Sequence, residues 1–248
     1  MFDRNLIFDV GLHKGLDAKF YAQKGFRVIG LEANPAMCVE AGVLLAAEIA
    51  TGQVKIVEKA LWDRAGEEIT FYTNAEKDDW GSAYRGIAEK GMYTAKEIRV
   101  PTLTLADLFD AHGVPYYIKC DIEGGDAILV RQLLMDKRRP AFVSIEAMTL
   151  LDLATLAACG YDRFQIVNQQ YNWNVQPPDP PREGKFAAAQ FTGHMSGLFG
   201  RELPANRWFS IDEVSERFLM WSRLRLLDDM LAPGWLDFHA TTGAELAK

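Results

Sequence analysis

The sequence predicts an α/β protein with a Rossmann-like, mainly parallel, seven-stranded sheet and helices on both faces. Short apolar runs alternate with helix-compatible segments from residue 6 to residue 168, and this alternation is typical of parallel sheets. The first run ends in Gly11 and Gly15, which predict a tight turn before a helix. The second run ends in Glu32, 21 residues after Gly11. That spacing is close to the one that places a ribose-binding acid in a nucleotide-binding βαβ unit.

The other elements follow from apolar periodicity and from turn residues. Pro35 suits the first turn of a helix, and Asp63 to Gly66 suit a turn before a strand. Residues 74–93 are polar and predict a loop with one short helix. We expect helices at residues 17–24, 35–50, 105–112, 126–134, 150–158 and 211–231, the last with Trp221, Leu224 and Leu227 on one stripe, and further strands at residues 54–57, 69–72, 98–102, 116–121, 141–146, 164–168 and 235–240.

The regular alternation ends at residue 168. Residues 169–210 contain the cluster Pro177 to Pro181 and many polar residues, and a long irregular segment is usually functional or disordered. Aromatic residues such as Phe191 and Phe199 argue against disorder. We therefore expect a core formed by residues 1–168 and 211–248, with residues 169–210 as a cap over an acceptor site.

Composition limits the partners and the compartment. The chain has 248 residues and a net charge of −7, which gives no indication of a nucleic acid or an anionic membrane as partner. No apolar run approaches the ~18 residues that span a bilayer, and the first strand begins too early for a signal peptide. Three separated cysteines predict reduced, buried thiols in a cytoplasmic protein. The oligomeric state stays open, a homodimer included.

The glycine turn indicates which nucleotide binds. A dinucleotide site favours Gly-x-Gly-x-x-Gly, whereas residues 9–15 read Asp-Val-Gly-Leu-His-Lys-Gly and lack the middle glycine. His13 and Lys14 would crowd a pyrophosphate. S-adenosylmethionine needs only close passage of the backbone, and Asp9 can hold its ammonium directly or through water. The alternative is an ordinary turn with glycines for packing, but the preceding strand and Glu32 favour a ligand.

Acids recur where the predicted strands end, and parallel sheets bind ligands at that edge. The sharpest motif is residues 121–126, Asp-Ile-Glu-Gly-Gly-Asp, in which Asp121 follows a core strand and Asp126 can cap the next helix. Lys119 is either a salt-bridge partner or a catalytic group. A metal bound by Asp121, Glu123, Glu146 and His194 has no diagnostic spacing, and we predict none.

Several motifs together resemble the FkbM family of S-adenosylmethionine-dependent methyltransferases. They are residues 7–15, 28–35 and 118–124, with further similarity at residues 100–105 and 196–200. The resemblance implies a class I methyltransferase fold with an antiparallel last strand, and methyl transfer usually to a hydroxyl oxygen of sugars or other small metabolites. It places Asp9, Gly11, Gly15 and Glu32 in the cofactor motifs and Asp121 and Glu123 in an Asp-x-Glu-Gly motif. Cys120 and Gly125 depart from the pattern and affect the shape of the pocket.

Methyl transfer requires an acceptor oxygen that is held close, aligned and, where needed, deprotonated. We expect Asp121 to orient or deprotonate the acceptor, or to brace the cofactor's amino-acid end, with Glu123 or His194 as the next candidates for the base. His13 lies near the cofactor turn, where a hydrogen bond at the helix start is the simpler explanation. The remaining candidates are Ala60 and Leu61 beside the adenine, and Glu146, Tyr171, Trp173 and His194 as acceptor contacts, although the aromatic residues also suit the interior of the cap.

The resulting hypothesis is a methyltransferase that uses S-adenosylmethionine to O-methylate a hydroxyl of a small metabolite. A nicotinamide-dependent oxidoreductase is the first alternative, and the missing middle glycine counts against it. The second is a non-catalytic cofactor-binding protein, which would be favoured if Asp121 and Glu123 were fully buried in salt bridges.

Overall fold

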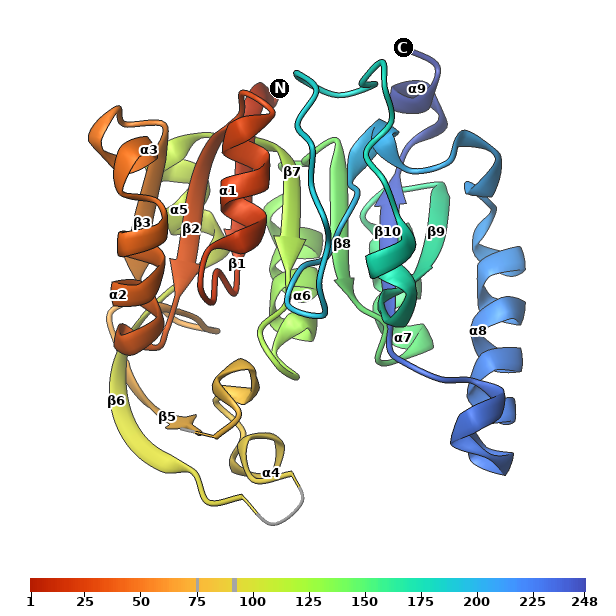
Figure 1. Cartoon of the computed structure of the whole chain (residues 1–248). Helices are drawn as coiled ribbons and strands as arrows, with labels where there is room; N and C mark the ends of the chain where they lie inside the picture. The colour runs from red at the N-terminus through yellow and green to blue at the C-terminus, as the bar shows by residue number, and fades with distance from the viewer. Residues whose placement is uncertain (75, 91–92) are drawn as a thin grey trace.

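A computed structural model describes residues 1–74, 76–90 and 93–248 of the chain (Figure 1). Its centre is a seven-stranded sheet in the order β3-β2-β1-β7-β8-β10-β9. The strands are β1 (Asp3–Val10), β2 (Arg27–Glu32), β3 (Val54–Glu58), β7 (Pro115–Cys120), β8 (Phe142–Glu146), β9 (Arg163–Asn168) and β10 (Leu236–Thr241). Neighbouring strands pair in parallel, except that β10 runs antiparallel to β8 and β9. The predicted class I sheet, with its antiparallel last strand, is confirmed.

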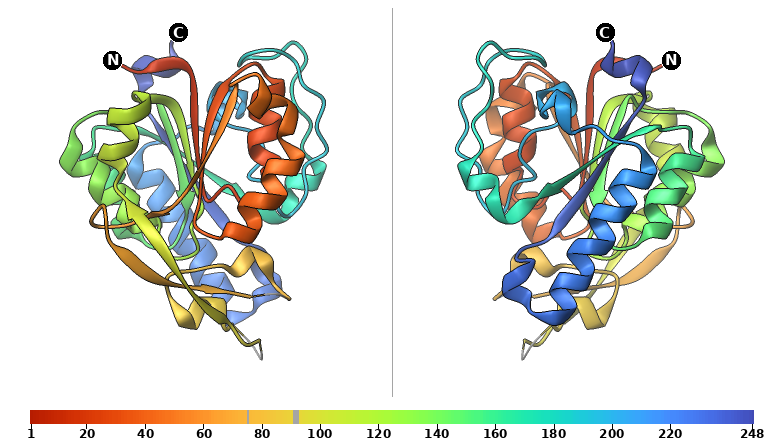
Figure 2. Two further views of the ribbon diagram at one scale, coloured as in Figure 1. Left: turned by 90° about the vertical axis from the view of Figure 1, so that its left-hand side faces the viewer. Right: turned by 90° about the vertical axis from the view of Figure 1, so that its right-hand side faces the viewer.

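Helices cover both faces of this sheet, as predicted. They are α1 (Leu16–Gln23), α2 (Pro35–Leu44), α3 (Ala46–Ala50), α5 (Leu105–His112), α6 (Asp126–Asp136), α7 (Leu150–Ala158), α8 (Ile211–Leu227) and the short α9 (Gly243–Leu246). In Figure 2, the red and orange α1 and α2 lie on one side of the sheet, and the green and blue α5 to α8 on the other. Each face has its own apolar cluster. Within the described ranges, none of the helices is both long and apolar enough to cross a membrane.

Local sequence explains where the helices begin. The Asn34 side chain accepts a hydrogen bond from the backbone of Ala36, and Pro35 occupies the first position of α2. Thr104 and Asp107 form a capping box at the start of α5. Because α2 begins directly after β2, the cap at Asn34 also fixes the chain beside Glu32, which ends that strand.

A second, smaller sheet projects beyond the carboxyl ends of the main strands (Figure 1). It contains β4 (Ala60–Leu61), β5 (Glu68–Thr73) and β6 (Lys96–Leu103) in the order β4-β6-β5. The single-turn helix η1 (Asp78–Trp80) and α4 (Arg85–Ala88) lie between β5 and β6. We call residues 68–103 the β5–β6 arm. The predicted loop at residues 74–93 corresponds to η1 and α4, although residues 75, 91 and 92 of it lie outside the described residues.

Two predicted helices differ from the observed ones. The helix expected at residues 35–50 is divided into α2 and α3, because the backbone of the buried Leu45 leaves helical geometry at φ −100° and ψ 14°. The helix expected to reach residue 231 ends at Leu227, since Asp228 is extended at φ −164° and starts the short helix η5 (Asp229–Leu231). The predicted stripe is also wrong at its far end, because Leu227 is 78% exposed. Val214 and Phe218 are the buried residues of α8.

Residues 169–210 are ordered, with short helices η2 (Gln169–Asn174), η3 (Gly200–Glu202) and η4 (Ala205–Arg207). Most of this segment packs beside α1 on one face of the main sheet. The rings of Phe191 and Phe199 lie 5.1 Å and 4.9 Å from those of Phe20 and Tyr21, respectively. The expectation of a cap therefore needs correction: these residues mainly complete the core, and only Gln169 and residues 193–196 reach the pocket described next.

Candidate active site

A cavity of about 1060 Å³ lies at the carboxyl ends of the main strands. β1, β2, β7 and β8 contribute to its floor, the β5–β6 arm forms one side and α8 the other. This is the switch point of the sheet, where strand order reverses between β1 and β7. Single ligand pockets typically measure about 300–1,000 Å³, so this cavity has room for two small molecules side by side.

The glycines of the first turn are required by packing. Gly11 has φ 85°, and a Cβ atom there would lie 1.8 Å from the carbonyl oxygen of Asp121. The turn after β1 therefore crosses directly over the turn after β7. Gly15 has φ 81°, and a Cβ atom there would lie 2.7 Å from Leu45 Cδ1. Gly11 lines the cavity but Gly15 does not. The prediction of Gly15 as a cofactor contact is corrected, since it lets α1 pack against α2.

Glu32 lies at the tip of β2 and lines the cavity. Its Oε2 accepts a hydrogen bond from the His13 backbone at 2.8 Å, and Oε1 accepts one from the Asn34 backbone at 2.7 Å. Burial raises the pKa of Glu32, and these two N–H groups oppose that shift. A carboxylate has about four acceptor positions. Acceptor capacity on Glu32 therefore remains for the hydroxyl groups of a ligand.

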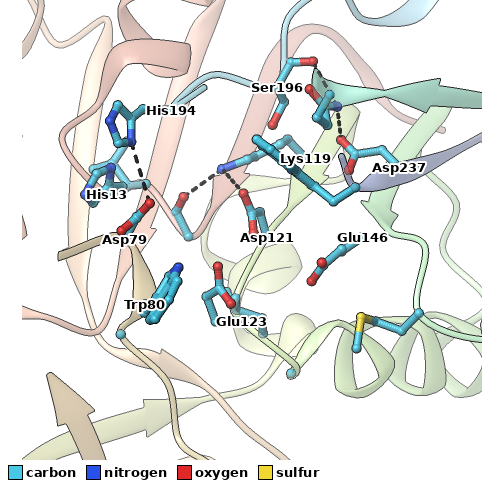
Figure 3. A pocket seen from close by; sticks show the side chains of 18 of the residues that line it. His13, Asp79, Trp80, Lys119, Asp121, Glu123, Glu146, His194, Ser196 and Asp237 are labelled. Carbon is cyan, nitrogen blue, oxygen red and sulfur yellow. Dashed lines mark hydrogen bonds and ion pairs between the residues drawn. The ribbon is translucent and has the colours of Figure 1, made fainter. Parts of the chain in front are cut away.

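His13 and His194 meet on the side of the cavity next to the β5–β6 arm (Figure 3). Asp78 of η1 lies 3.3 Å from His13 Nε2 and 2.5 Å from Lys14 Nζ. The His194 ring is 5.8 Å from the His13 ring, and His194 Nδ1 is 3.9 Å from Asp79 Oδ2. Burial lowers the pKa of His13, opposed by Asp78. His194 thus lies with the glycine turn and η1, apart from Glu123 and Glu146 in Figure 3.

Lys119 joins the turns of β1 and β7. Its ammonium donates a hydrogen bond to the Gly11 carbonyl at 2.8 Å and lies 3.3 Å from Asp9 Oδ1 and 3.8 Å from Asp121 Oδ2. Burial opposes its charged form, but Asp9, Asp121 and Asp17 together raise the pKa of Lys119. Asp9 is 0% exposed and does not line the cavity. The predicted direct contact between Asp9 and a ligand is therefore corrected: Asp9 acts on the site through Lys119.

Three carboxyl groups face the same part of the cavity: Asp121, Glu123 and Glu146 (Figure 3). Asp121 and Glu123 are not fully buried in salt bridges, since their side chains are 48% and 23% exposed, although each has a lysine ammonium within 4 Å. Burial, followed by Asp121 and Glu146, raises the pKa of Glu123 to about 8. Burial and Asp121 also raise the pKa of Glu146. A carboxyl group that titrates near neutral pH is suited to proton transfer.

Comparison with known proteins decides the family. The model of the methyltransferase FkbM domain matches residues 9–162, a span that contains the glycine turn, Glu32 and the Asp121 turn. The chain belongs to the FkbM methyltransferase family. The resemblance seen in the sequence is thereby confirmed, and the region after residue 162, which supplies α8 and β10, lies outside the matched span.

Other comparisons with this FkbM-family protein are more distant. No curated protein matches its sequence. Among solved structures, it is similar to a precorrin-6y C5,15-methyltransferase from Geobacter metallireducens GS-15, with 13% identity, a TM-score of 0.41 and coverage of 98% of this chain and 82% of that one. It is also similar to an antibiotic related methyltransferase, with 10% identity, a TM-score of 0.36 and coverage of 96% and 87%, respectively.

Asp126 of the FkbM-family chain has a different role from the predicted helix cap. Its Oδ1 accepts a hydrogen bond from the Ile122 backbone at 2.9 Å, and Oδ2 accepts one from the Glu146 backbone at 2.8 Å. No side chain caps α6, which begins after Gly125. Burial raises the pKa of Asp126 to about 7. This buried carboxyl group therefore ties the Asp121 turn to the end of β8 and fixes Glu123 relative to Glu146.

Two predicted acceptor contacts lie elsewhere. Tyr171 and Trp173 do not line the cavity and are 49% and 62% exposed. η2 turns Gln169 and Asn172 inward instead, so its aromatic side chains face solvent. The other predicted contacts, Glu146 and His194, do line the cavity, as do Ala60 and Leu61. No group of three or more His, Cys, Asp or Glu residues among the described ones is arranged to hold a metal.

Several residues that line the cavity were not predicted from the sequence. Asp78, Asp79 and Trp80 reach the cavity from η1, Trp221 and Leu226 reach it from α8, and Asp17, Ser196 and Asp237 also line it. For η1, the available signal was the pair of acids Asp78 and Asp79 directly before Trp80 in a glycine-containing loop. For α8, the available signal was the helical spacing of residues on a face other than the one that carries Leu224 and Leu227.

Proposed function

We propose that this protein transfers a methyl group from S-adenosylmethionine to a hydroxyl oxygen of a small metabolite. The observation that carries the proposal is a single cavity in which two kinds of site meet. Glu32 offers free acceptor positions on one side, and the carboxyl groups of Asp121, Glu123 and Glu146 face the same space on the other. Family membership supports the methyl transfer, and the cavity's carboxyl cluster supports a hydroxyl acceptor.

The residues present fit the cofactor that the family implies. Glu32 would accept hydrogen bonds from both ribose hydroxyls. Ala60, Leu61 and Phe71 are apolar lining residues suited to an adenine ring, and the turn at Gly11 would receive the amino-acid end. S-adenosylmethionine supplies a methyl group activated by its sulfonium when bound.

The chain's own residues position the acceptor and take its proton. Asp121 accepts a hydrogen bond from the acceptor hydroxyl, which aims an oxygen lone pair into the cavity. Lys119, 3.8 Å away, holds that carboxylate in place. The hydroxyl proton passes to Asp121 or to the deprotonated fraction of Glu123, which grows as the pH rises toward the pKa of about 8 of that group. His194 is the remaining candidate for the base.

Calorimetric titration tests the cofactor assignment. We expect S-adenosylmethionine and S-adenosylhomocysteine to bind and NAD not to bind. Glu32→Gln should weaken binding of S-adenosylmethionine at least tenfold, because a lost charge-assisted hydrogen bond costs roughly 1.5–3 kcal/mol. Glu58→Gln is the matched control, since Glu58 pairs with Glu32 in register at the tip of β3 and is exposed. Tight NAD binding, or equal affinity in both variants, would refute the assignment.

A further inference from the structure

We propose that the methyl acceptor is an amphiphile: a hydroxyl group attached to an apolar chain or ring system, with no anionic group beside the hydroxyl. This inference rests on the proposed function and names the substrate class of the same cavity. It comes from the side of the cavity opposite the β5–β6 arm. There, Met148, Phe218, Trp221, Leu226 and Trp235 form what we call the apolar wall.

The helical spacing of α8 builds most of this wall. Its lining residues recur at intervals of three and four positions, which places them on one face of the helix: Phe218, Trp221, Ser222, Arg225 and Leu226. Val214, four positions before Phe218, begins this face and lies in the core. Phe218 is nearly buried and stacks against Trp221 at 6.5 Å, whereas Leu226 is 87% exposed. The face therefore passes from the core, along the cavity, to its mouth.

The side chains of Ser222 and Arg225 on this face have partners within the protein, whereas the Trp221 indole N–H has none among the described residues. Arg225 donates a hydrogen bond to the Gly234 carbonyl, lies 3.4 Å from Asp229 and covers the Trp221 ring at 5.0 Å. Ser222 donates a hydrogen bond to the Phe218 carbonyl at 2.9 Å. These groups are therefore occupied, and the wall presents mainly apolar surface to a ligand. A free sugar would turn hydroxyl groups toward surface that cannot pair with them, which is unfavourable.

The apolar surface continues outward from the mouth of the cavity. Leu227, Met230 and Leu231, at the end of α8 and in η5, are each more than half exposed. In Figure 1 this blue segment extends beyond the edge of the main sheet, opposite the β5–β6 arm. A chain or ring system on the wall could extend along this surface, since burial of apolar area favours binding.

The inner end of the cavity sets the charge of the acceptor. Glu123, Glu146 and Asp237 line it. Among the described residues, no hydrogen bond or ion pair engages the Glu146 carboxylate. The amide of Gln169 donates a hydrogen bond to Asp237. An anionic group next to the reacting hydroxyl would lose its hydration there and would be repelled by each of these carboxyl groups that is ionised. Hydroxy acids and sugar phosphates are therefore excluded as acceptors, whereas a neutral alcohol is accepted.

Three soluble probes separate these properties: 1-octanol, octanoate and glucose. Each is titrated into the whole protein saturated with S-adenosylhomocysteine and followed by ligand-observed NMR. We expect octanol to bind at least tenfold more tightly than octanoate, and glucose not to bind. Leu226→Asp should weaken octanol binding at least tenfold and leave the affinity for S-adenosylhomocysteine unchanged. Met220→Asp is the control, because Met220 is exposed on the same helix but does not line the cavity.

The outcomes distinguish this inference from the proposed function. If S-adenosylhomocysteine binds but octanol does not, the inference that the acceptor is an amphiphile is refuted while the proposed function stands. The same holds if octanoate and glucose bind as tightly as octanol. If S-adenosylhomocysteine itself fails to bind, the proposed function falls and the inference with it. Light scattering after gel filtration provides the last test, which measures the oligomeric state. A wild-type dimer that Leu226→Asp alone converts to a monomer would assign the wall to a second copy of the chain and overturn the inference.

Discussion

At the scale of single residues, Lys119 connects parts of the site that are far apart in sequence. Its ammonium contacts the Gly11 carbonyl, Asp9 and Asp121, and it is almost completely buried. Burial raises the pKa of Asp9, and the Lys119 ammonium 3.3 Å away is the main group that opposes this shift. The charge of Lys119 therefore compensates a carboxylate that solvent does not reach.

Removing this charge should destabilise the whole protein. Lys119→Met leaves Asp9 buried without a partner, and breaking a buried pair on one side typically costs about 3–5 kcal/mol. We expect the midpoint of urea unfolding to fall accordingly. The double variant Lys119→Met with Asp9→Asn should recover part of the loss, because the orphaned charge is gone. A Lys119→Met protein as stable as the parent would show that the pair contributes nothing.

Asp121→Asn tests the catalytic assignment. If Asp121 orients or deprotonates the acceptor, turnover should fall by about 10²–10⁴-fold. The affinity for S-adenosylmethionine should change little, because the carboxamide keeps the shape of the side chain. Formation of S-adenosylhomocysteine and calorimetric binding are measured on the same variant, with Asp212→Asn, at the exposed start of α8, as control. Weaker cofactor binding with intact turnover at saturation would mean that Asp121 only braces the cofactor, and the base would be Glu123 or His194.

At the scale of elements, the contact between η1 and the glycine turn links two segments that are more than 60 residues apart. Asp78 bridges His13 and Lys14 and is about one-third exposed. Asp78→Asn should weaken binding of S-adenosylmethionine three- to tenfold, since His13 and Lys14 both lose their anchor beside the glycine turn. Thermal stability should change little, because exposed ion pairs contribute less than about 1 kcal/mol. Glu76→Gln, two positions away, serves as control, and equal affinities in the two variants would contradict the role of η1.

The elements also show what the sequence can and cannot predict. Strand tips were predictable, because apolar runs end where polar residues begin; Glu32, Asp121, Glu123 and Glu146 all reach the cavity as expected. The contacts of η1 were not, since a polar loop has no periodicity that reveals its partners. The outward direction of Tyr171 and Trp173 depends on how η2 docks through Gln169 and Asn172. The division between α2 and α3 depends on one backbone conformation at Leu45.

At the scale of the whole molecule, the carboxyl cluster makes stability depend on pH. Native Glu123 keeps its proton up to about pH 8, whereas the unperturbed group releases it near 4.5. Between these values the native state binds more protons than the unfolded state, so stability falls as pH rises. Glu123→Gln removes this pH-dependent loss of stability, because glutamine does not titrate. We expect the variant to melt several degrees above the parent at pH 9 and the difference to shrink toward pH 5.

Thermal unfolding at pH 5, 7 and 9 measures this effect. Glu216→Gln, which removes an exposed carboxylate on α8, should follow the parent at every pH. A constant difference between Glu123→Gln and the parent across the range would show that Glu123 titrates normally. The instability expected at high pH is compatible with function, because active sites commonly retain groups that destabilise the fold.

The position of β10 has a consequence for how the protein is made. β10 follows every other strand of the main sheet in sequence, yet it lies between β8 and β9 and pairs with both. During synthesis, the facing edges of β8 and β9 stay unpaired until β10 has left the ribosome. Unpaired strand edges associate readily with other chains. A chain that stops before residue 236 should therefore be recovered as aggregate, even though it retains the glycine turn, Glu32 and the Asp121 turn.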